Sequence, residues 1–183
     1  MNDDATTTVR SPLYLVKSFE PCWKCHKEQS VIAIATRHIR TEDFDFLDAG
    51  DQGPVFLMNI EAMPQPILEY LSAAFPQFQN RRSHTMEMDY YANTCKDCGA
   101  NFGDFYLFNV GHAFSPMDAE QAKRMSIVEL PYSGTFEFQC SWSMGSAGDL
   151  IFRHAAGSES LPEAPPLKRT AKAKGRGKKP ADP

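Results

Sequence analysis

The 183-residue sequence has no apolar run approaching the roughly 18 residues of a membrane-spanning helix, so we expect no membrane segment. Residues 1–16 lack the basic start and long apolar run of a secretory signal, which favours a cytoplasmic location, where disulfides are rare. The chain contains no Gly-x-Ser-x-Gly motif, no phosphate-binding Gly-Lys-Ser/Thr loop and no dinucleotide-binding fingerprint. These absences support no recognised enzyme class, although short motifs miss sites that are assembled from distant segments.

Cysteine is scarce, with five residues, but four of them form two Cys-x-x-Cys pairs. Cys22 and Cys25 make the first pair, and Cys95 and Cys98 make the second. Four thiolates complete a tetrahedral shell for Zn²⁺ and leave no open position, so we expect a structural zinc. Closing the long loop between the pairs costs only roughly 0.6 kcal/mol per doubling of its length. Zinc binding in small peptides, at about 10–16 kcal/mol, easily exceeds this cost.

The residue after each pair affects how well a tight turn can form. This position often needs a positive φ, which glycine adopts freely; Gly99 satisfies the requirement, whereas His26 stands at the equivalent place in the first pair. His26 could also replace one thiolate as a ligand. Alternatively, the pairs could form disulfides or a redox site, but neither pair follows a strand and opens a helix in a βαβ pattern. The fifth cysteine, Cys140, is expected to be a small buried apolar residue.

Other polar residues predict no second site. The histidines show no His-x-x-x-His or His-Glu-x-x-His spacing; they are His26, His38, His84, His112 and His154. The carboxylates of residues 41–53 lack the glycine and the closing glutamate of a calcium loop, so we expect a solvated loop. Asp104 could act as an acid or base, or bond to backbone donors in a turn. The glycine-rich residues 145–149 are expected to form a turn.

The charge is unevenly distributed along the chain. The net charge is −4, but residues 168–183 contain seven Lys or Arg and one Asp, which leaves −10 on the other 167 residues. A basic tail can lie on nucleic acid, on an acidic partner or on the body itself. The candidate nucleic-acid-binding residues are Lys168, Arg169, Lys172, Lys174, Arg176, Lys178 and Lys179.

Three aromatic residues beside the cysteine pairs are further candidates for nucleic-acid contact. Trp23, Tyr90 and Tyr91 could stack on bases or pack beneath the turns that hold the cysteines. Arg81 and Arg82 could contact phosphate or form an ordinary solvated surface.

The chain reads as one domain between two disordered segments. Residues 1–12 are polar and show no periodicity, residues 13–156 form the zinc-containing globular domain, and residues 157–183 hold five prolines and few large apolar side chains. Thirteen Phe and six Tyr favour β-structure. We expect an α+β fold that is mostly antiparallel β, with a zinc-ribbon-like Cys₄ site and one or two short helices.

Hydrophobic patterns place the expected elements. The apolar spacing of residues 66–75 predicts a helix that begins after Pro64, and Ser115 is the expected N-cap of a second helix ending near Met125. Two of the expected strands flank the first cysteine pair as a hairpin, and two others are joined through residues 131–134. The strands are expected at residues 13–16, 31–35, 55–60, 104–110, 127–130, 135–140 and 150–152.

Residues 91–107 resemble a pattern that recurs in uncharacterised bacterial zinc-ribbon proteins. The shared features are an aromatic residue and Asn before Cys-x-x-Cys-Gly-Ala, followed by Gly-Asp, an aromatic residue and Leu. Such proteins often carry an upstream Pro-Cys-Trp-x-Cys, as at residues 21–25, with Gly where His26 stands here. The resemblance extends over about residues 13–110. It implies paired zinc-ligand motifs and no agreed activity.

Together these observations predict a zinc-stabilised binding or interaction module with a protein or nucleic-acid partner, and the basic tail is the candidate contact for nucleic acid. The alternative is an enzyme with an unrecognised active site that is separate from a structural zinc. A deep pocket holding an Asp or His with a shifted pKa would favour the enzyme.

Overall fold

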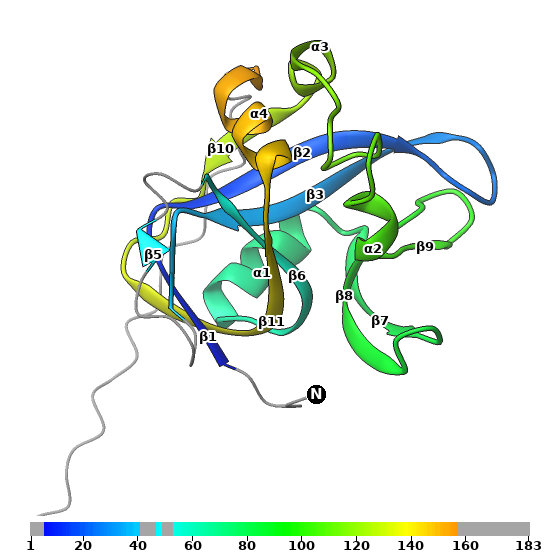
Figure 1. The fold of residues 1–183 in the computed structure, drawn as a ribbon. Helices are drawn as coiled ribbons and strands as arrows, with labels where there is room; N and C mark the ends of the chain where they lie inside the picture. Colours follow the sequence, from blue (N-terminus) through cyan, green and yellow to red (C-terminus); the bar gives the residue numbers. More distant parts are fainter. Residues whose placement is uncertain (1–5, 41–46, 49–52, 157–183) are drawn as a thin grey trace, which may run out of the picture.

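The computed structural model describes residues 6–40, 47–48 and 53–156. It confirms the expected α+β class, and these residues form two antiparallel sheets and four short helices (Figure 1). Within the described residues, no helix has the length and apolar character needed to cross a membrane.

In the described part of the chain the larger sheet has eight strands, and each neighbouring pair is antiparallel. The longest ladder joins β2 to β3 over nine residues each, as a hairpin that encloses the first cysteine pair. In spatial order the strands are β10 (Ser126–Glu129), β2 (Leu13–Pro21), β3 (Glu28–Thr36), β6 (Val55–Ala62), β11 (Thr135–Met144), β1 (Thr6–Arg10), β4 (His38–Arg40) and β5 (Leu47–Asp48).

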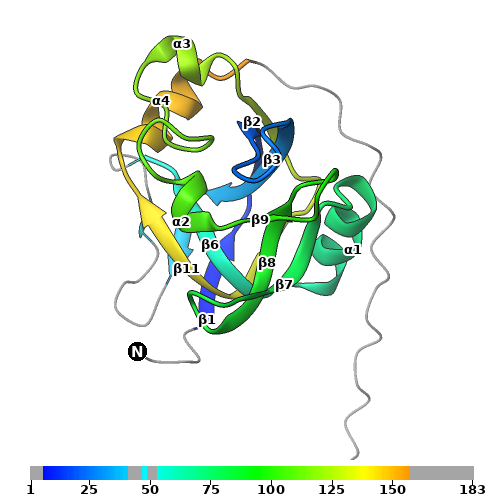
Figure 2. The same ribbon diagram turned by 90° about the vertical axis from the view of Figure 1, so that its right-hand side faces the viewer.

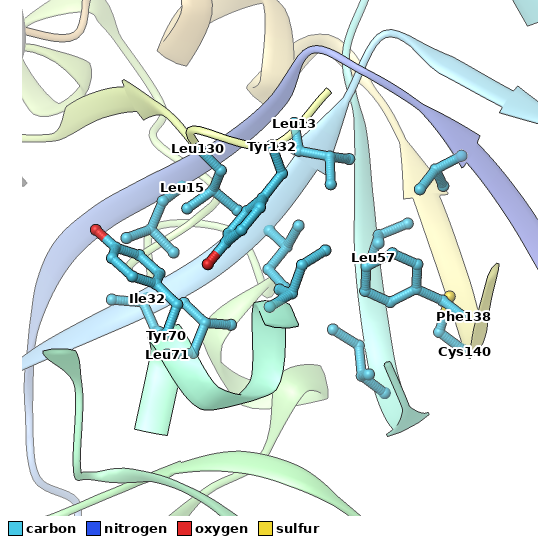
Figure 3. Packing of buried hydrophobic residues seen from close by; sticks show 14 of the residues in the cluster. Leu13, Leu15, Ile32, Leu57, Tyr70, Leu71, Leu130, Tyr132, Phe138 and Cys140 are labelled. Atoms are coloured by element: carbon cyan, nitrogen blue, oxygen red, sulfur yellow. The ribbon is translucent and has the colours of Figure 1, made fainter. Parts of the chain in front are cut away.

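Both faces of the β2–β3 hairpin are buried. Leu15 and Ile34 belong to a cluster that includes the inner face of α1 (Gln65–Ala74), whereas Val16 and Ala35 belong to a second cluster. The second cluster includes residues of α2 (Asp104–Leu107) and α4 (Ser146–His154). Figure 3 shows the first cluster, where Tyr70 and Leu71 of the helix approach side chains from the sheet. Because successive residues of a strand point to opposite faces, the apolar runs of β2 and β3 supply both cores.

The smaller sheet contains β7 (Phe78–Ser83), β8 (Met88–Thr94) and β9 (Asn101–Phe102), with β8 in the middle. The buried side chain of Asn93 joins this sheet to the larger one. Its Oδ1 accepts the Ile32 N–H at 2.8 Å, and its Nδ2 donates to the Ile32 carbonyl at 2.9 Å. Asn93 thus bonds to the edge of β3 as a neighbouring strand would, and it places the end of β8 beside the tip of the β2–β3 hairpin.

Most of the expected elements are confirmed. Strands cover the expected ranges 13–16, 31–35, 55–60 and 135–140, and β10 covers most of 127–130. The helix expected at 66–75 is α1, where Ile67 and Leu71 are completely buried and Pro66 lies in the first turn.

The sequence prediction of an irregular arm over residues 1–12 is wrong for its described part. Thr6–Arg10 form β1, which pairs with β11 over five residues. Thr7 and Val9 are buried, and the Thr7 hydroxyl bonds to the Cys140 carbonyl at 3.3 Å. A run of β-branched residues carried the signal for this strand. The predicted tail at 157–183 lies outside the described residues.

Four further predictions are corrected by tertiary contacts. Residues 104–107 form α2 instead of a strand, and the helix near residue 115 is only α3 (Ala119–Ala122), capped by Asp118, whose Oδ1 accepts the Gln121 N–H. The strand expected at 150–152 and the turn expected at 145–149 are replaced by α4. The strands β10 and β11 follow each other through residues 130–134, as predicted, and each pairs with other strands: β10 with β2, and β11 with β6 and β1.

Candidate metal centre

The first cysteine pair lies in the turn between β2 and β3. The Cys22 N–H donates to the Lys27 carbonyl at 2.9 Å, and the His26 N–H donates to the Cys22 carbonyl at 2.8 Å. His26 adopts a left-handed backbone, with φ of 61°. The turn that holds two sulfurs therefore forms without the glycine that this position favours.

The second pair, between β8 and β9, repeats this geometry. The Cys95 N–H donates to the Ala100 carbonyl at 2.8 Å, and the Gly99 N–H donates to the Cys95 carbonyl at 2.9 Å. Gly99 has φ of 69°. Each Cys-x-x-Cys segment thus forms the same turn, in which both sulfurs lie on one side of the chain.

The four sulfurs converge, as the spacing predicted. All of them lie within 4.8 Å of one another, with Cys22 and Cys98 at 3.6 Å and Cys25 and Cys95 also at 3.6 Å. The sulfurs of a tetrahedral zinc site, with bonds of about 2.3 Å, are about 3.8 Å apart. A disulfide would require about 2.05 Å, and the four cysteines are free thiols. His26 is exposed and lies outside this cluster.

Polar contacts hold the two turns together. Asp97 accepts a bond from Lys27 Nζ at 2.8 Å and one from Gln29 Nε2 at 2.9 Å. Gln29 is buried, and its Oε1 accepts the Lys96 N–H at 3.1 Å. Lys27 and Gln29 lower the pKa of the Asp97 carboxyl, so this group stays charged over a wide pH range. These contacts join the two cysteine turns directly, in addition to the convergence of the sulfurs.

A further contact comes from Trp23. Its indole N–H donates to the Asn101 carbonyl at 2.9 Å, although the side chain is 58% exposed. The hairpin tip and β9 therefore lie side by side, as both ribbon views show (Figure 1, Figure 2).

The thiols influence one another strongly. Burial raises the pKa of Cys22, but N–H groups of Cys25 and Lys24 and the neighbouring thiols outweigh it, and the pKa is lowered to about 7. The Ala100 N–H lowers the pKa of Cys98, but burial and the adjacent thiols Cys95 and Cys22 raise it to about 12. Because the four thiols are so close together, ionisation of one makes ionisation of the others less favourable. A bound divalent cation would favour the thiolate form of all four.

The donor set fits zinc. Thiolates are soft ligands, and four of them in a tetrahedral arrangement suit Zn²⁺ or an iron–sulfur site. Backbone N–H groups of Cys25, Lys27 and Ala100 bond to the sulfurs and orient them. Within the described part of the chain, this is the only group of three or more metal-binding side chains. Four thiolates would fill the shell, so the arrangement favours a role in holding the fold.

A buried polar cluster beside Cys22 was not predicted from the sequence. Glu20 is 6% exposed, and its Oε1 accepts the Tyr106 hydroxyl at 3.0 Å and lies 2.9 Å from His112 Nδ1. The Tyr106 and His112 rings are in contact, with centroids 4.2 Å apart. The cluster attaches α2 and the loop after it to the β2–β3 hairpin. No sequence signal indicated it, because Glu20 is separated from its partners by 86 and 92 residues.

Asp104, a candidate acid or base, is buried. Its Oδ2 accepts the Asn59 N–H at 2.6 Å, and burial raises its pKa to about 7. The cavity that it lines with apolar side chains has a volume of only about 10 Å³. Such a space holds about one water molecule. The shifted pKa is therefore not accompanied by the deep pocket that an active site requires.

The remaining candidates have different outcomes. Tyr90 is buried and Tyr91 stacks on Phe78, so both pack within the fold, whereas Trp23 is exposed. Cys140 is buried as predicted, and burial raises its pKa to about 12. Most of the carboxylate-rich loop at 41–53 lies outside the described residues, as do all the candidate nucleic-acid-binding residues of the tail.

Comparisons with protein-family models, curated proteins and solved structures found no match for this chain. The resemblance to bacterial zinc-ribbon proteins therefore stays a prediction that rests on the two cysteine motifs.

Proposed function

We propose that this chain is a binding module whose fold depends on one structural zinc ion, held by Cys22, Cys25, Cys95 and Cys98. The observation that carries the proposal is the convergence of four sulfurs from distant segments to within 4.8 Å of one another. Bound zinc would contribute folding free energy by joining the large sheet to the small one. A cytoplasmic location and a bacterial zinc-ribbon relationship belong to the same proposal.

The basic tail is the proposed contact with nucleic acid. Its seven Lys and Arg residues oppose the −10 charge of the rest of the chain, and phosphate is a natural ligand for such a segment. The enzyme alternative has less support, because the buried Asp104 lines a cavity with room for about one water molecule. We therefore place the activity in binding and assign no reaction.

Elemental analysis of the purified protein tests the metal centre. We expect one zinc per chain, loss of zinc in Cys95→Ser, and an early thermal transition in that variant and in protein treated with a chelator. Cys140→Ala is the matched control, because it removes a buried thiol outside the cluster and should keep the zinc. A protein without zinc or another thiolate-bound metal, or a Cys95→Ser variant that melts like the parent protein, would contradict the proposal.

A further inference from the structure

A groove of about 720 Å³ lies between α1 and β7, and no residue of the cysteine cluster lines it. Glu69 and Ser72 belong to the wall formed by the outward face of α1, and Asn80 and Tyr91 belong to the opposite wall. Asn80 of β7 and Tyr91 of β8 are cross-strand neighbours, and Figure 2 shows both strands beside the helix. The volume of the groove falls within the roughly 300–1,000 Å³ of ligand-binding sites.

Part of the lining is apolar. The half-buried ring of Tyr91 stacks on the buried ring of Phe78, with centroids 6.0 Å apart, and both residues line the groove. Leu68 and Ala73 add aliphatic surface from α1. A ligand that covers these side chains removes apolar area from water, which favours binding. The groove therefore suits a ligand with at least one apolar face.

The rest of the lining offers neutral hydrogen-bonding groups. The Ser72 hydroxyl, the Asn80 amide and the Tyr91 hydroxyl make no hydrogen bond to another residue in the described part of the chain. Gln79 Nε2 donates to the Pro76 carbonyl at 2.6 Å, which leaves its Oε1 as an acceptor. Amides and hydroxyls together supply both donors and acceptors. A ligand in the groove can therefore form several hydrogen bonds without breaking any within the protein.

The charge of the lining restricts the class of ligand. Glu69 is the only charged residue that lines the groove, and Gln65 Nε2 holds its Oε1 at 3.1 Å. No Lys or Arg of the described chain lines it, so a phosphate or an acidic peptide would meet only repulsion from Glu69. A carboxylate instead accepts strong hydrogen bonds from hydroxyl groups. The lining thus favours an uncharged ligand that carries hydroxyls.

We propose that this groove binds a neutral oligosaccharide. A sugar ring has an apolar face of C–H groups, and its hydroxyls both donate and accept hydrogen bonds. The C–H face would lie against Tyr91, and the hydroxyls would bond to Glu69, Ser72 and Asn80. The inference goes beyond the proposed function, because the groove lies outside the cysteine cluster and its charge does not suit the phosphates of a nucleic acid.

NMR titrations of the full-length, zinc-loaded protein with neutral tetrasaccharides of glucose, galactose, mannose and N-acetylglucosamine test the groove. We expect at least one of them to bind with a Kd below about 1 mM. Asn80→Ala and Ser72→Ala should each weaken that complex about two- to tenfold through the loss of a hydrogen bond. Both residues are exposed, so zinc content and melting temperature should not change.

The matched control is Arg81→Ala. Arg81 is also exposed and follows Asn80 in β7, but successive residues of a strand point to opposite faces, and Arg81 does not line the groove. This variant should bind the saccharide as the parent protein does.

The carboxylate of Glu69 gives a second readout. The parent protein should bind a sulfated form of the same tetrasaccharide at least about fivefold more weakly than the neutral form, because the sulfate is repelled by Glu69. Glu69→Gln should weaken binding of the neutral form and narrow the difference between the two forms. Glu69 is exposed on α1, so this variant should fold normally.

The outcomes separate this inference from the metal proposal. Failure of the folded, zinc-loaded protein to bind any of the tetrasaccharides at roughly 10 mM would overturn the saccharide groove and leave the metal centre intact. Equal affinity of the parent protein, Asn80→Ala and Ser72→Ala would also overturn it. Binding of a neutral peptide that alternates serine with valine, together with no saccharide binding, would assign the groove to a protein partner and overturn it too. Absence of zinc would contradict the proposed function, and the saccharide titrations could still be measured.

Discussion

His26 and Gly99 occupy the same position in the two cysteine turns. Each follows the second cysteine of its pair, each donates its N–H to the carbonyl of the first cysteine, and their φ angles are 61° and 69°. Only Gly99 adopts this conformation without a steric cost, because the left-handed backbone brings a Cβ too close to the following carbonyl. The first turn is thus maintained against a local conformational preference.

Replacing the histidine with glycine should therefore stabilise the protein. Relief of the left-handed strain is worth about 1–2 kcal/mol, and the greater freedom of glycine in the unfolded chain offsets about 0.4–1 kcal/mol of it. We expect His26→Gly to raise the free energy of unfolding by about 0.5–1 kcal/mol, measured by urea unfolding of the zinc-loaded protein.

The matched control is Gly99→Ala, which should destabilise the protein by about 1 kcal/mol. A Cβ at Gly99 would meet no atom within 4 Å, so this variant reports the conformational cost alone. Both variants should retain zinc. A His26→Gly variant less stable than the parent would show that the imidazole itself has a stabilising role.

Between the two turns, the buried amide of Gln29 should matter more than the exposed ion pair of Lys27. Gln29→Met would leave the Lys96 N–H without its partner, at a cost of about 1–3 kcal/mol. Lys27→Ala would remove an ion pair whose lysine side chain is 64% exposed, which is worth less than about 1 kcal/mol. Thermal melts of the zinc-loaded variants check this order, and an equal or larger effect of Lys27→Ala would contradict it.

The cysteine cluster could be predicted from the sequence because its four side chains lie in two short Cys-x-x-Cys motifs. The helix α1 could be predicted because its apolar residues repeat with the helical period, and the hairpin because its strands contain short apolar runs on either side of the cysteine pair. By contrast, α2 was predicted as a strand: its aromatic residues favour β-structure, but Asp104 bonds to Asn59 and Tyr106 bonds to Glu20, and these distant contacts decide the conformation.

The glycine-rich start of α4 was misleading for a related reason. Gly148 lies where a Cβ would approach Pro54 to 3.0 Å, so this glycine permits close packing instead of marking a turn. Such a contact joins segments almost a hundred residues apart and leaves no periodic signal.

Removing the tail should reduce affinity for nucleic acid in a salt-dependent way. For single-stranded DNA, the binding constant falls with salt concentration, and the slope of log K against log salt measures the number of phosphate contacts. Because residues 168–183 contain seven cationic side chains, deleting them should make this slope shallower by about 5. Titrating a labelled oligonucleotide at several salt concentrations measures this slope. A tail with shuffled sequence and the same charge should restore binding, while equal slopes with and without the tail would rule out phosphate contact by these residues.

Ionisation of Asp104 should lower the free energy of unfolding as the pH rises. Burial raises the pKa of this carboxyl in the folded protein from 3.8 to about 7, so folding favours the protonated form. The resulting stabilisation is complete below pH 3.8 and is lost progressively as the pH rises to about 7. Above that pH the carboxyl is ionised in the folded protein as well, and the free energy of unfolding falls no further through this group. Since the unfolded chain is already ionised at pH 6, the contribution of Asp104 falls by about 1.4 kcal/mol between pH 6 and pH 8.

The variant Asp104→Asn isolates the effect of this carboxyl from that of the other titratable groups. Its amide oxygen can still accept the Asn59 N–H, but the side chain carries no charge at any pH. We expect the difference in unfolding free energy between variant and parent to shift in favour of the variant by about 1.4 kcal/mol from pH 6 to pH 8. Urea unfolding of both zinc-loaded proteins at each pH measures that difference. If it stays constant over this range, the carboxyl does not titrate there, and the burial of Asp104 would have to be compensated by a bonding partner other than Asn59.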